Sequence, residues 1–224
     1  MIDLSLEGKK AVVTGASLGI GAAVVKMLAD QGASVTFCAR TKDSVEELSK
    51  YKTKGKGTVK GLIADMGEET STNKFIESVQ EEGHTDILVN NVGASPSRNF
   101  LYMTDDDWRS LHELNLLSAV RCTRAFLPHM REQNSGHIVN ISSTTARYGF
   151  SHIRSIPYIS TKWSVEGITW CLSVTEKEHN IRVNALCPGL AYTYFQRNSP
   201  RDYFVGQKCW NPDHTVGPLL YILT

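Results

Sequence analysis

Two side chains in the second half of the chain, Tyr158 and Lys162, have the types and the spacing needed for proton transfer. They stand four residues apart in a segment with helical patterning, so they share one face of a helix. An unperturbed tyrosine has a pKa of about 10 and exchanges protons poorly at neutral pH, but a nearby ammonium favours the phenolate and lowers that pKa. We therefore expect Tyr158 to act as a general acid or base toward a carbonyl or alcohol oxygen, with Lys162 tuning it.

A pair of serines precedes this helix, at the carboxyl end of a predicted strand over residues 137–142. Ligands bind at such strand ends in open parallel α/β sheets. Ser143 can donate a hydrogen bond to an oxygen that gains charge during a reaction, and Ser142 is the alternative. Residues 144–157, between the serines and the tyrosine, are either a harmless insertion or a pocket wall that carries Tyr148, Phe150, His152 and Arg154.

Short β-branched runs alternate with longer helix-patterned segments along the whole chain, which is typical of parallel βαβ units. The predicted strands cover residues 10–14, 34–39, 58–64, 87–90, 137–142 and 182–186. The predicted helices cover residues 21–30, 42–51, 69–82, 105–132 and 158–179. We expect an α/β fold: a single Rossmann-type domain over residues 1–224, with a doubly wound parallel sheet and helices on both faces.

A turn with three glycines, Gly15, Gly19 and Gly21, follows the first predicted strand and opens the first helix. Small residues there let the backbone approach a pyrophosphate, and the helix amino terminus offers free N–H groups and positive dipole charge. Outside a βαβ context the same glycines would indicate only a tight turn. Inside it, they predict a dinucleotide site.

The choice of dinucleotide depends on the end of the second strand, which reads Cys38-Ala39-Arg40. An acidic side chain there would bond to the ribose hydroxyls of NAD and repel a 2′-phosphate. The strand end carries no acid, and Arg40 can bind a phosphate through two parallel charge-assisted hydrogen bonds. NADP (NADPH) is therefore favoured and NAD less so, on the strength of one arginine that could also be a plain surface charge.

These motifs together resemble the short-chain dehydrogenase/reductase family, including its ketoacyl reductases and carbonyl reductases. The resemblance runs from the glycine turn to about residue 195, and three motifs carry it: Thr14-Gly15-x-x-x-Gly19-Ile20-Gly21, Asn90-Asn91-Val92-Gly93 and Tyr158-x-x-x-Lys162. Val92 stands where the family usually has alanine.

The resemblance implies a catalytic group of four residues, Asn115, Ser143, Tyr158 and Lys162. In the family, the residue that Asn115 matches interrupts a helix locally and holds a water that contacts the lysine, although Asn115 could instead satisfy a neighbouring backbone group. The implied cofactor-binding residues are Gly15, Ser17, Leu18, Gly19, Ile20, Gly21, Arg40, Asp65, Asn91, Tyr158, Lys162, Pro188, Gly189 and Thr193. Among them Asp65 could equally cap the next turn. No metal is implied.

The carboxyl end departs from the family pattern. Relatives continue into a seventh strand, whereas the apolar run at residues 216–224 resembles the helix that precedes it. We expect that last strand to be missing, residues 194–224 to form a shortened substrate-covering and C-terminal region, and an unpaired sheet edge with uncovered apolar surface to result. The family implies a homodimer or homotetramer. A dimer through the helices bearing Asn115 and Tyr158 does not need the missing strand.

Composition argues against several other partners. Lys and Arg number 24 against 23 Asp and Glu, so the chain has no basic excess for a nucleic acid backbone. Its five cysteines are widely spaced and never form Cys-x-x-Cys, which predicts neither a disulfide framework nor a zinc site. No apolar run approaches the roughly 20 residues of a membrane span, and the amino end does not resemble a signal peptide. We expect a cytoplasmic protein that contacts no membrane.

The sequence thus predicts an NADP-dependent oxidoreductase that moves a hydride between NADPH and a small-molecule carbonyl or secondary alcohol. The alternative is a dinucleotide-binding protein without turnover, such as a sensor or partner subunit. The substrate is not predicted, because loops determine it in this fold. Six aromatic side chains either line an apolar pocket or simply pack: Phe100, Tyr148, Phe150, Tyr192, Tyr194 and Phe195.

Overall fold

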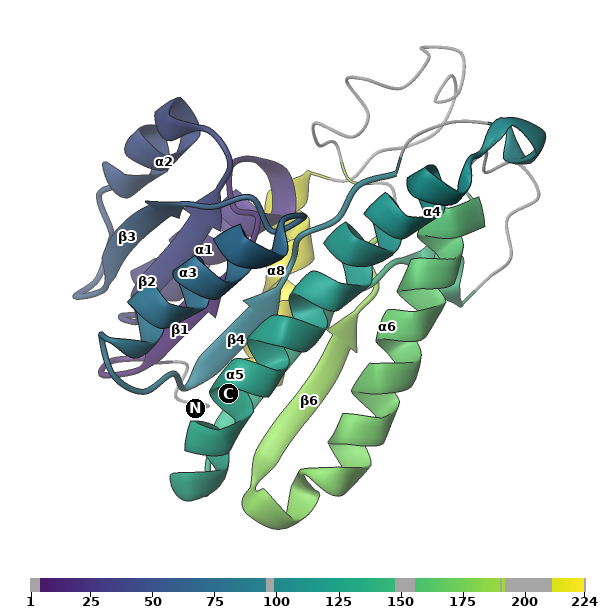
Figure 1. Cartoon of the computed structure of the whole chain (residues 1–224). Coiled ribbons are helices and arrows are strands. Elements are labelled where there is room, and N and C mark those ends of the chain that lie inside the picture. Colours follow the sequence, from purple (N-terminus) through teal and green to yellow (C-terminus); the bar gives the residue numbers. More distant parts are fainter. Residues whose placement is uncertain (1–4, 96–98, 148–155, 190, 192–210, 224) are drawn as a thin grey trace.

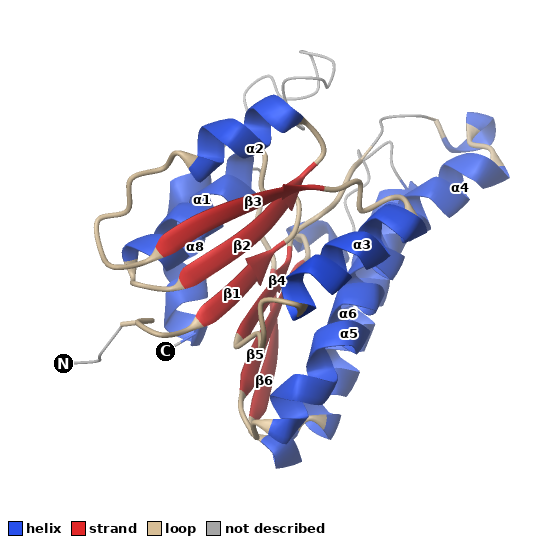
Figure 2. Ribbon diagram, turned by 60° about the vertical axis from the view of Figure 1, so that its left-hand side comes forward, coloured by secondary structure: helices blue, strands red, loops and turns tan. Residues whose placement is uncertain are grey.

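Six parallel strands form one sheet in the computed structural model, which describes residues 5–95, 99–147, 156–189, 191 and 211–223. The strands are β1 (Lys10–Val13), β2 (Ser34–Ala39), β3 (Thr58–Ile63), β4 (Ile87–Asn90), β5 (Gly136–Ile141) and β6 (Ile181–Leu186). Their order is β3-β2-β1-β4-β5-β6, so the chain winds outward from β1, returns to β4 and winds outward in the other direction (Figures 1 and 2). The carboxyl ends beside β1 and β4 are therefore the switch point at which open α/β sheets bind ligands.

Helices cover both faces of this sheet (Figure 2). One face carries α1 (Gly19–Asp30), α2 (Lys42–Ser49) and α8 (Pro212–Leu223). The other carries α3 (Glu69–Gln80), α5 (Ser118–Glu132) and α6 (Ile156–Thr175), with α4 (Asp105–His112) leading into α5. The predicted doubly wound α/β sheet is confirmed. Within the described residues, no helix is both long and apolar enough to cross a lipid bilayer.

Two apolar clusters lie between the sheet and its helix layers, because the central strands are apolar on both faces. Val13 and Phe37, both fully buried, pack toward α1, α2 and α8. Leu88 and Ile138 pack on the other face, among side chains of α3 and α5. Burial of this kind stabilises each large side chain by about 1.5–3 kcal/mol.

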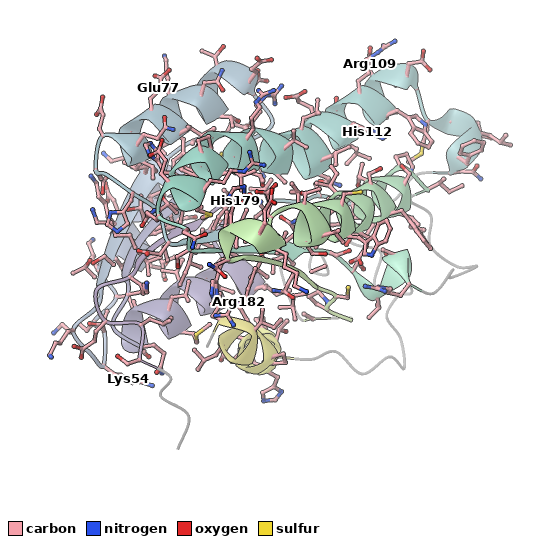
Figure 3. The ribbon with its side chains drawn as sticks, turned by 90° about the horizontal axis from the view of Figure 1, so that it is seen from below. Lys54, Glu77, Arg109, His112, His179 and Arg182 are labelled. Carbon is pink, nitrogen blue, oxygen red and sulfur yellow. The ribbon has the colours of Figure 1, made fainter. Side chains whose placement is uncertain are left out.

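The final apolar segment forms the expected helix, α8, beside α1 (Figure 1). Two leucines of this helix are well packed. Leu219 and Leu223 are 0% and 4% exposed and belong to the core cluster on that face. Arg182 of β6, labelled next to α8 in Figure 3, also donates a hydrogen bond to the Leu223 carbonyl at 3.3 Å. Strand β6 lies at one edge of the sheet that the described residues form.

The predicted strands match the observed ones to within one residue at each end, but the long helix predicted over 105–132 is interrupted. It consists of α4, a π-helical turn η2 (Glu113–Leu117) and α5. A π turn frees one backbone carbonyl from the regular pattern. Ser118 donates its hydroxyl to the carbonyl of Leu114 at 2.5 Å, which satisfies one such group locally.

Candidate active site

Four polar side chains from three segments meet at the carboxyl ends of the central strands. Tyr158 and Lys162 lie in the first turns of α6, Ser143 follows β5, and Asn115 lies in the π turn η2. The structure thus brings together the four residues that the sequence singled out.

The Lys162 side chain is buried, with 4% of its surface exposed, and its Nζ donates to the carbonyl of Ile141 at 2.7 Å. Burial lowers the pKa of this ammonium from 10.5 to about 8, while the nearby Cys187 acts in the opposite direction. A Cβ placed on Gly93 would lie 3.2 Å from Nζ and 3.6 Å from Asn115 Oδ1. A glycine at that position leaves room for the lysine and asparagine side chains to lie against the turn after β4.

The Tyr158 phenol lies between Ser143 and Lys162. Burial raises the pKa of Tyr158, and a hydrogen bond from the Ser143 hydroxyl lowers it in part. Lys162 Nζ lies 5.7 Å from the centre of the phenol ring and donates to the Ile141 carbonyl. The sequence-based expectation of a lowered tyrosine pKa is therefore wrong for this arrangement, because desolvation of the phenolate outweighs the neighbouring groups.

Ser143, not Ser142, is the serine that reaches the tyrosine. Its Oγ also accepts hydrogen bonds from the backbone N–H and the hydroxyl of Thr145, at 3.2 Å and 3.0 Å. These two bonds leave the Ser143 proton to be donated outward, toward the phenol. The Ser142 hydroxyl is buried and has no hydrogen-bond partner among the described residues.

Both polar atoms of the Asn115 side-chain amide form hydrogen bonds. Its Oδ1 accepts from the backbone N–H of Ala94 at 2.8 Å, and its Nδ2 donates to the Ala94 carbonyl at 2.9 Å and to Thr161 Oγ1 at 3.1 Å. The helix is interrupted at Asn115, as the resemblance implies, and the side chain also satisfies backbone groups, as the alternative suggests. Thr161 was not identified from the sequence, although it stands between Tyr158 and Lys162.

The glycine turn before α1 fits a dinucleotide pyrophosphate. Gly15 and Gly19 have φ of 68° and 61°, a region that favours glycine. A Cβ on Gly21 would lie 2.5 Å from Asn91 Nδ2 and 2.7 Å from the Gly15 carbonyl oxygen. Leu18 provides no side-chain cap, so the N–H groups of the first turn of α1 point outward and are available to an anion. Ser17 and Ile20 flank these groups, partly buried.

Asn91 supports this turn from behind. Its Nδ2 donates to the carbonyls of Thr14 and Gly15 at 3.0 Å and 2.9 Å, and its backbone N–H donates to Thr14 Oγ1 at 3.1 Å. The sequence grouped Asn91 with the cofactor-binding residues. In the structure its side-chain amide binds the glycine turn.

The remaining predicted cofactor residues that the structure describes lie around the carboxyl ends of the strands. Arg40 follows β2, is exposed and forms no ion pair with the described residues. Asp65 Oδ1 accepts from the backbone N–H of Gly67 at 2.9 Å, which is the capping contact given as the alternative for this residue. After β6, the Pro188 carbonyl accepts from Thr144 N–H at 3.1 Å, and Gly189 is exposed with open space around its Cα.

Several predicted residues lie outside the described part of the chain: Tyr148, Phe150, His152, Arg154, Tyr192, Thr193, Tyr194 and Phe195. Of the six candidate pocket aromatics, only Phe100 is described. It is 53% exposed and contacts Trp108 edge to face, with ring centroids 6.4 Å apart.

The sheet order and the glycine turn at its switch point define the Rossmann class of dinucleotide-binding α/β proteins. The comparisons with known proteins narrow that class. The family described as short chain dehydrogenase matches residues 9–203, and the chain belongs to this family of oxidoreductases, which interconvert CH–OH and C=O groups.

Individual relatives agree with this assignment. An uncharacterized oxidoreductase of Bacillus subtilis is 38% identical over 196 residues, which cover 86% of this chain and 72% of the relative. A 3-oxoacyl-[acyl-carrier-protein] reductase of Thermotoga maritima is 31% identical over 198 residues, covering 88% of this chain and 80% of the relative. A crystal structure of a 3-oxoacyl (acyl-carrier-protein) reductase from Agrobacterium tumefaciens with NADP bound is similar with a TM-score of 0.90 at 26% identity. That alignment covers 99% of this chain and 90% of the other.

Proposed function

We propose that this chain is an NADP-dependent oxidoreductase that transfers a hydride between NADPH and the carbonyl or secondary alcohol of a small molecule. The observation that carries the proposal is the Tyr158–Ser143 hydrogen bond beside the buried Lys162, at the strand ends next to the glycine turn. The nicotinamide supplies or accepts the hydride when it is bound.

The side chains of the site supply proton transfer, hydrogen bonding and positioning. Tyr158 is protonated at neutral pH, since a phenol has a pKa of about 10 and burial raises the pKa of Tyr158 further, so its phenol can donate a proton to a carbonyl oxygen. Ser143 has a hydroxyl proton directed toward the same phenol, and the same proton can be donated to an oxygen that gains charge. Asn115 fixes the strand-end segment at Ala94 against α6 through Thr161, which stands next to Lys162 in the sequence.

A turnover assay tests the proposal and distinguishes it from the alternative, a dinucleotide-binding protein without turnover. Purified chain should oxidise NADPH in the presence of at least one member of a panel of ketones and aldehydes. Tyr158→Phe should abolish that turnover and leave the dissociation constant for NADPH within about threefold of the wild type, since the affected hydroxyl acts on the substrate. Tyr51→Phe is the matched control, because the Tyr51 hydroxyl bonds to Asp30 on the α2 side of the sheet. Tight NADPH binding without turnover on any member of the panel would instead support the non-catalytic alternative.

Arg40 supports the choice of NADP. The side chain is exposed at the end of β2, where a 2′-phosphate would lie, and the described residues give it no acidic partner. The NADP-bound relative from Agrobacterium tumefaciens is consistent with this choice. Arg40→Ala should weaken NADPH binding by at least tenfold and leave NADH binding nearly unchanged, as measured by calorimetry. Lys42→Ala is the control, since Lys42 is exposed and already paired with Glu46. Equal losses for the two dinucleotides would refute the assignment.

We also propose that the chain forms a homodimer through α5 and α6. Trp163, Trp170 and Val174 are 55%, 72% and 62% exposed, and their spacing places them along one stripe of α6. Exposed apolar stripes of this kind mark interaction surfaces. Trp170→Glu should convert a dimer into a monomer in light scattering without loss of helical circular dichroism. A monomeric wild type at micromolar concentration would refute the proposal. A cytoplasmic location and a single domain over residues 1–224 stay predictions.

A further inference from the structure

One carboxylate on α6 joins three segments of the candidate site. Glu166 Oε1 accepts a hydrogen bond from the Cys187 thiol at 3.0 Å, and its Oε2 pairs with the Arg147 guanidinium at 2.8 Å. Arg147 and Cys187 also interact directly through their side chains. The Glu166 side chain is 13% exposed, so water competes weakly for these bonds.

Each partner of Glu166 is attached to a part of the proposed active site. Arg147 directly follows the short 3₁₀ turn η3 (Thr144–Ala146), which starts directly after Ser143. Cys187 is the first residue after β6 and precedes the Pro188-Gly189 turn. Glu166 itself follows Lys162 by four residues, on the same helix face as Tyr158 and Lys162. The serine segment, the turn after β6 and the Tyr–Lys helix therefore share one anchoring group.

The charges around Glu166 determine which groups donate and which accept in these hydrogen bonds. Burial and the neighbouring Glu166 raise the pKa of the Cys187 thiol, and Arg147 lowers it in part. The thiol therefore stays protonated at neutral pH and donates to the carboxylate. The ion pair with Arg147 offsets the cost of holding the carboxylate in a largely buried place. A second link, from Thr144 N–H to the Pro188 carbonyl at 3.1 Å, connects the same two segments directly.

We propose that Glu166 is a positioning residue for the hydride-transfer reaction. Together with Arg147 and Cys187, it sets the placement of Ser143 and of the Pro188-Gly189 turn relative to Tyr158 and Lys162. This inference rests on the proposed function. It assigns no contact between Glu166 and substrate or cofactor. Small displacements of reacting groups cost on the order of 100-fold in rate, so loosening this anchor should affect turnover more than binding.

The kinetic test compares two glutamates that both pair with an arginine. Glu166→Gln should lower kcat about 10- to 100-fold while the NADPH dissociation constant changes less than about threefold. Glu176→Gln is the matched control, because Glu176 binds Arg131 at 2.7 Å just past the opposite end of α6. The control should lower the melting temperature and leave kcat within about twofold. A Glu166→Gln kcat within twofold of the wild type, or a fall no larger than in Glu176→Gln, would overturn the positioning role.

Cys187 provides the conservative rescue. Cys187→Ala removes the donor and should lower kcat in the same way as Glu166→Gln. Cys187→Ser restores a donor to the carboxylate and should recover at least about one third of the wild-type kcat. An alanine variant as active as the serine variant would contradict the proposal.

A measurement without substrate tests the cluster independently of turnover. The readout is the rate at which iodoacetamide alkylates Cys187 at pH 8, resolved by peptide mass spectrometry with the exposed Cys171 as the internal reference. Glu166→Gln should speed the reaction, because it removes a cause of the raised thiol pKa. Arg147→Met should slow it, because Arg147 lowers that pKa. Unchanged rates would refute the contacts themselves.

The two proposals fail in different ways. A wild-type chain that turns over no carbonyl while its alkylation rates change as expected would refute the proposed function. An active wild type with a fully active Glu166→Gln variant would refute the positioning role alone.

Discussion

Replacement of Lys162 by methionine should stabilise the folded chain at neutral pH while removing its activity. The ammonium is 4% exposed, and burial lowers its pKa from 10.5 to about 8. Each unit of pKa shift corresponds to about 1.4 kcal/mol, so the buried charge costs roughly 3 kcal/mol of folding free energy when it is fully protonated. Methionine has similar length and carries no charge, so it removes this cost.

The effect has a defined dependence on pH. As pH rises, the folded state releases the Lys162 proton near pH 8, whereas the unfolded chain keeps it until about pH 10.5. The cost of the buried ammonium is therefore complete below pH 8 and vanishes above pH 10.5. The advantage of Lys162→Met over the wild type should decrease across this window, by up to about 1.4 kcal/mol per pH unit. Loss of the bond to Ile141 subtracts an amount that does not depend on pH.

Urea unfolding of both proteins at pH 7, 8, 9 and 10 measures this difference. The wild-type curve alone is insufficient, because burial raises the pKa of Cys38 to about 12 and also raises the pKa of Cys122. Those thiols make folding less favourable above pH 9, which opposes the gain in wild-type stability as Lys162 loses its proton. They are present in both proteins and cancel in the difference. A difference that stays constant within about 1 kcal/mol from pH 7 to pH 10 would refute the reasoning.

Three further substitutions test the fold. His137→Gln should flatten the loss of stability on acidification from pH 6.5 to 4, measured by urea unfolding at several pH values. Burial and Arg182 lower the His137 pKa to about 4, so protonation costs stability as pH falls through this range. A wild type equally stable at pH 4.5 and 7 would contradict this. Gly21→Ala should cost about 1–3 kcal/mol and weaken NADPH binding, because its Cβ would clash with Asn91 Nδ2. A melting temperature at or above the wild-type value would exclude the clash. Thr104→Ala should cost about 1 kcal/mol in thermal unfolding, since Thr104 forms the capping box of α4, and no measurable change would rule out that cap.

Several features of this protein could be read from the sequence because they depend on short spacing. The period of apolar residues predicts β1 to β6 and their alternation with helices, and all six strands are observed. The spacing of Tyr158 and Lys162 places them on one helix face whatever surrounds that helix. The glycines of the first turn are needed wherever a strand enters a helix this tightly.

Other features depend on which distant segments pack together. The direction of the Tyr158 pKa shift follows from burial, which is a sum over the whole fold, and spacing alone suggested the opposite sign. The interruption between α4 and α5 was implied by the family resemblance, but not its π-helical form or its hydrogen bonds to Ala94 and Thr161.

The Glu166 cluster shows most clearly which features follow from spacing in the sequence and which follow from tertiary packing. The sequence places Glu166 four residues after Lys162, which is enough to predict a shared helix face. Nothing in the local pattern connects it to Arg147 or to Cys187, because those residues reach it only when β5 and β6 pair and α6 packs across them. Local spacing thus determined which groups could do chemistry, and the pairing of distant strands decided which of them are held together, buried and charged.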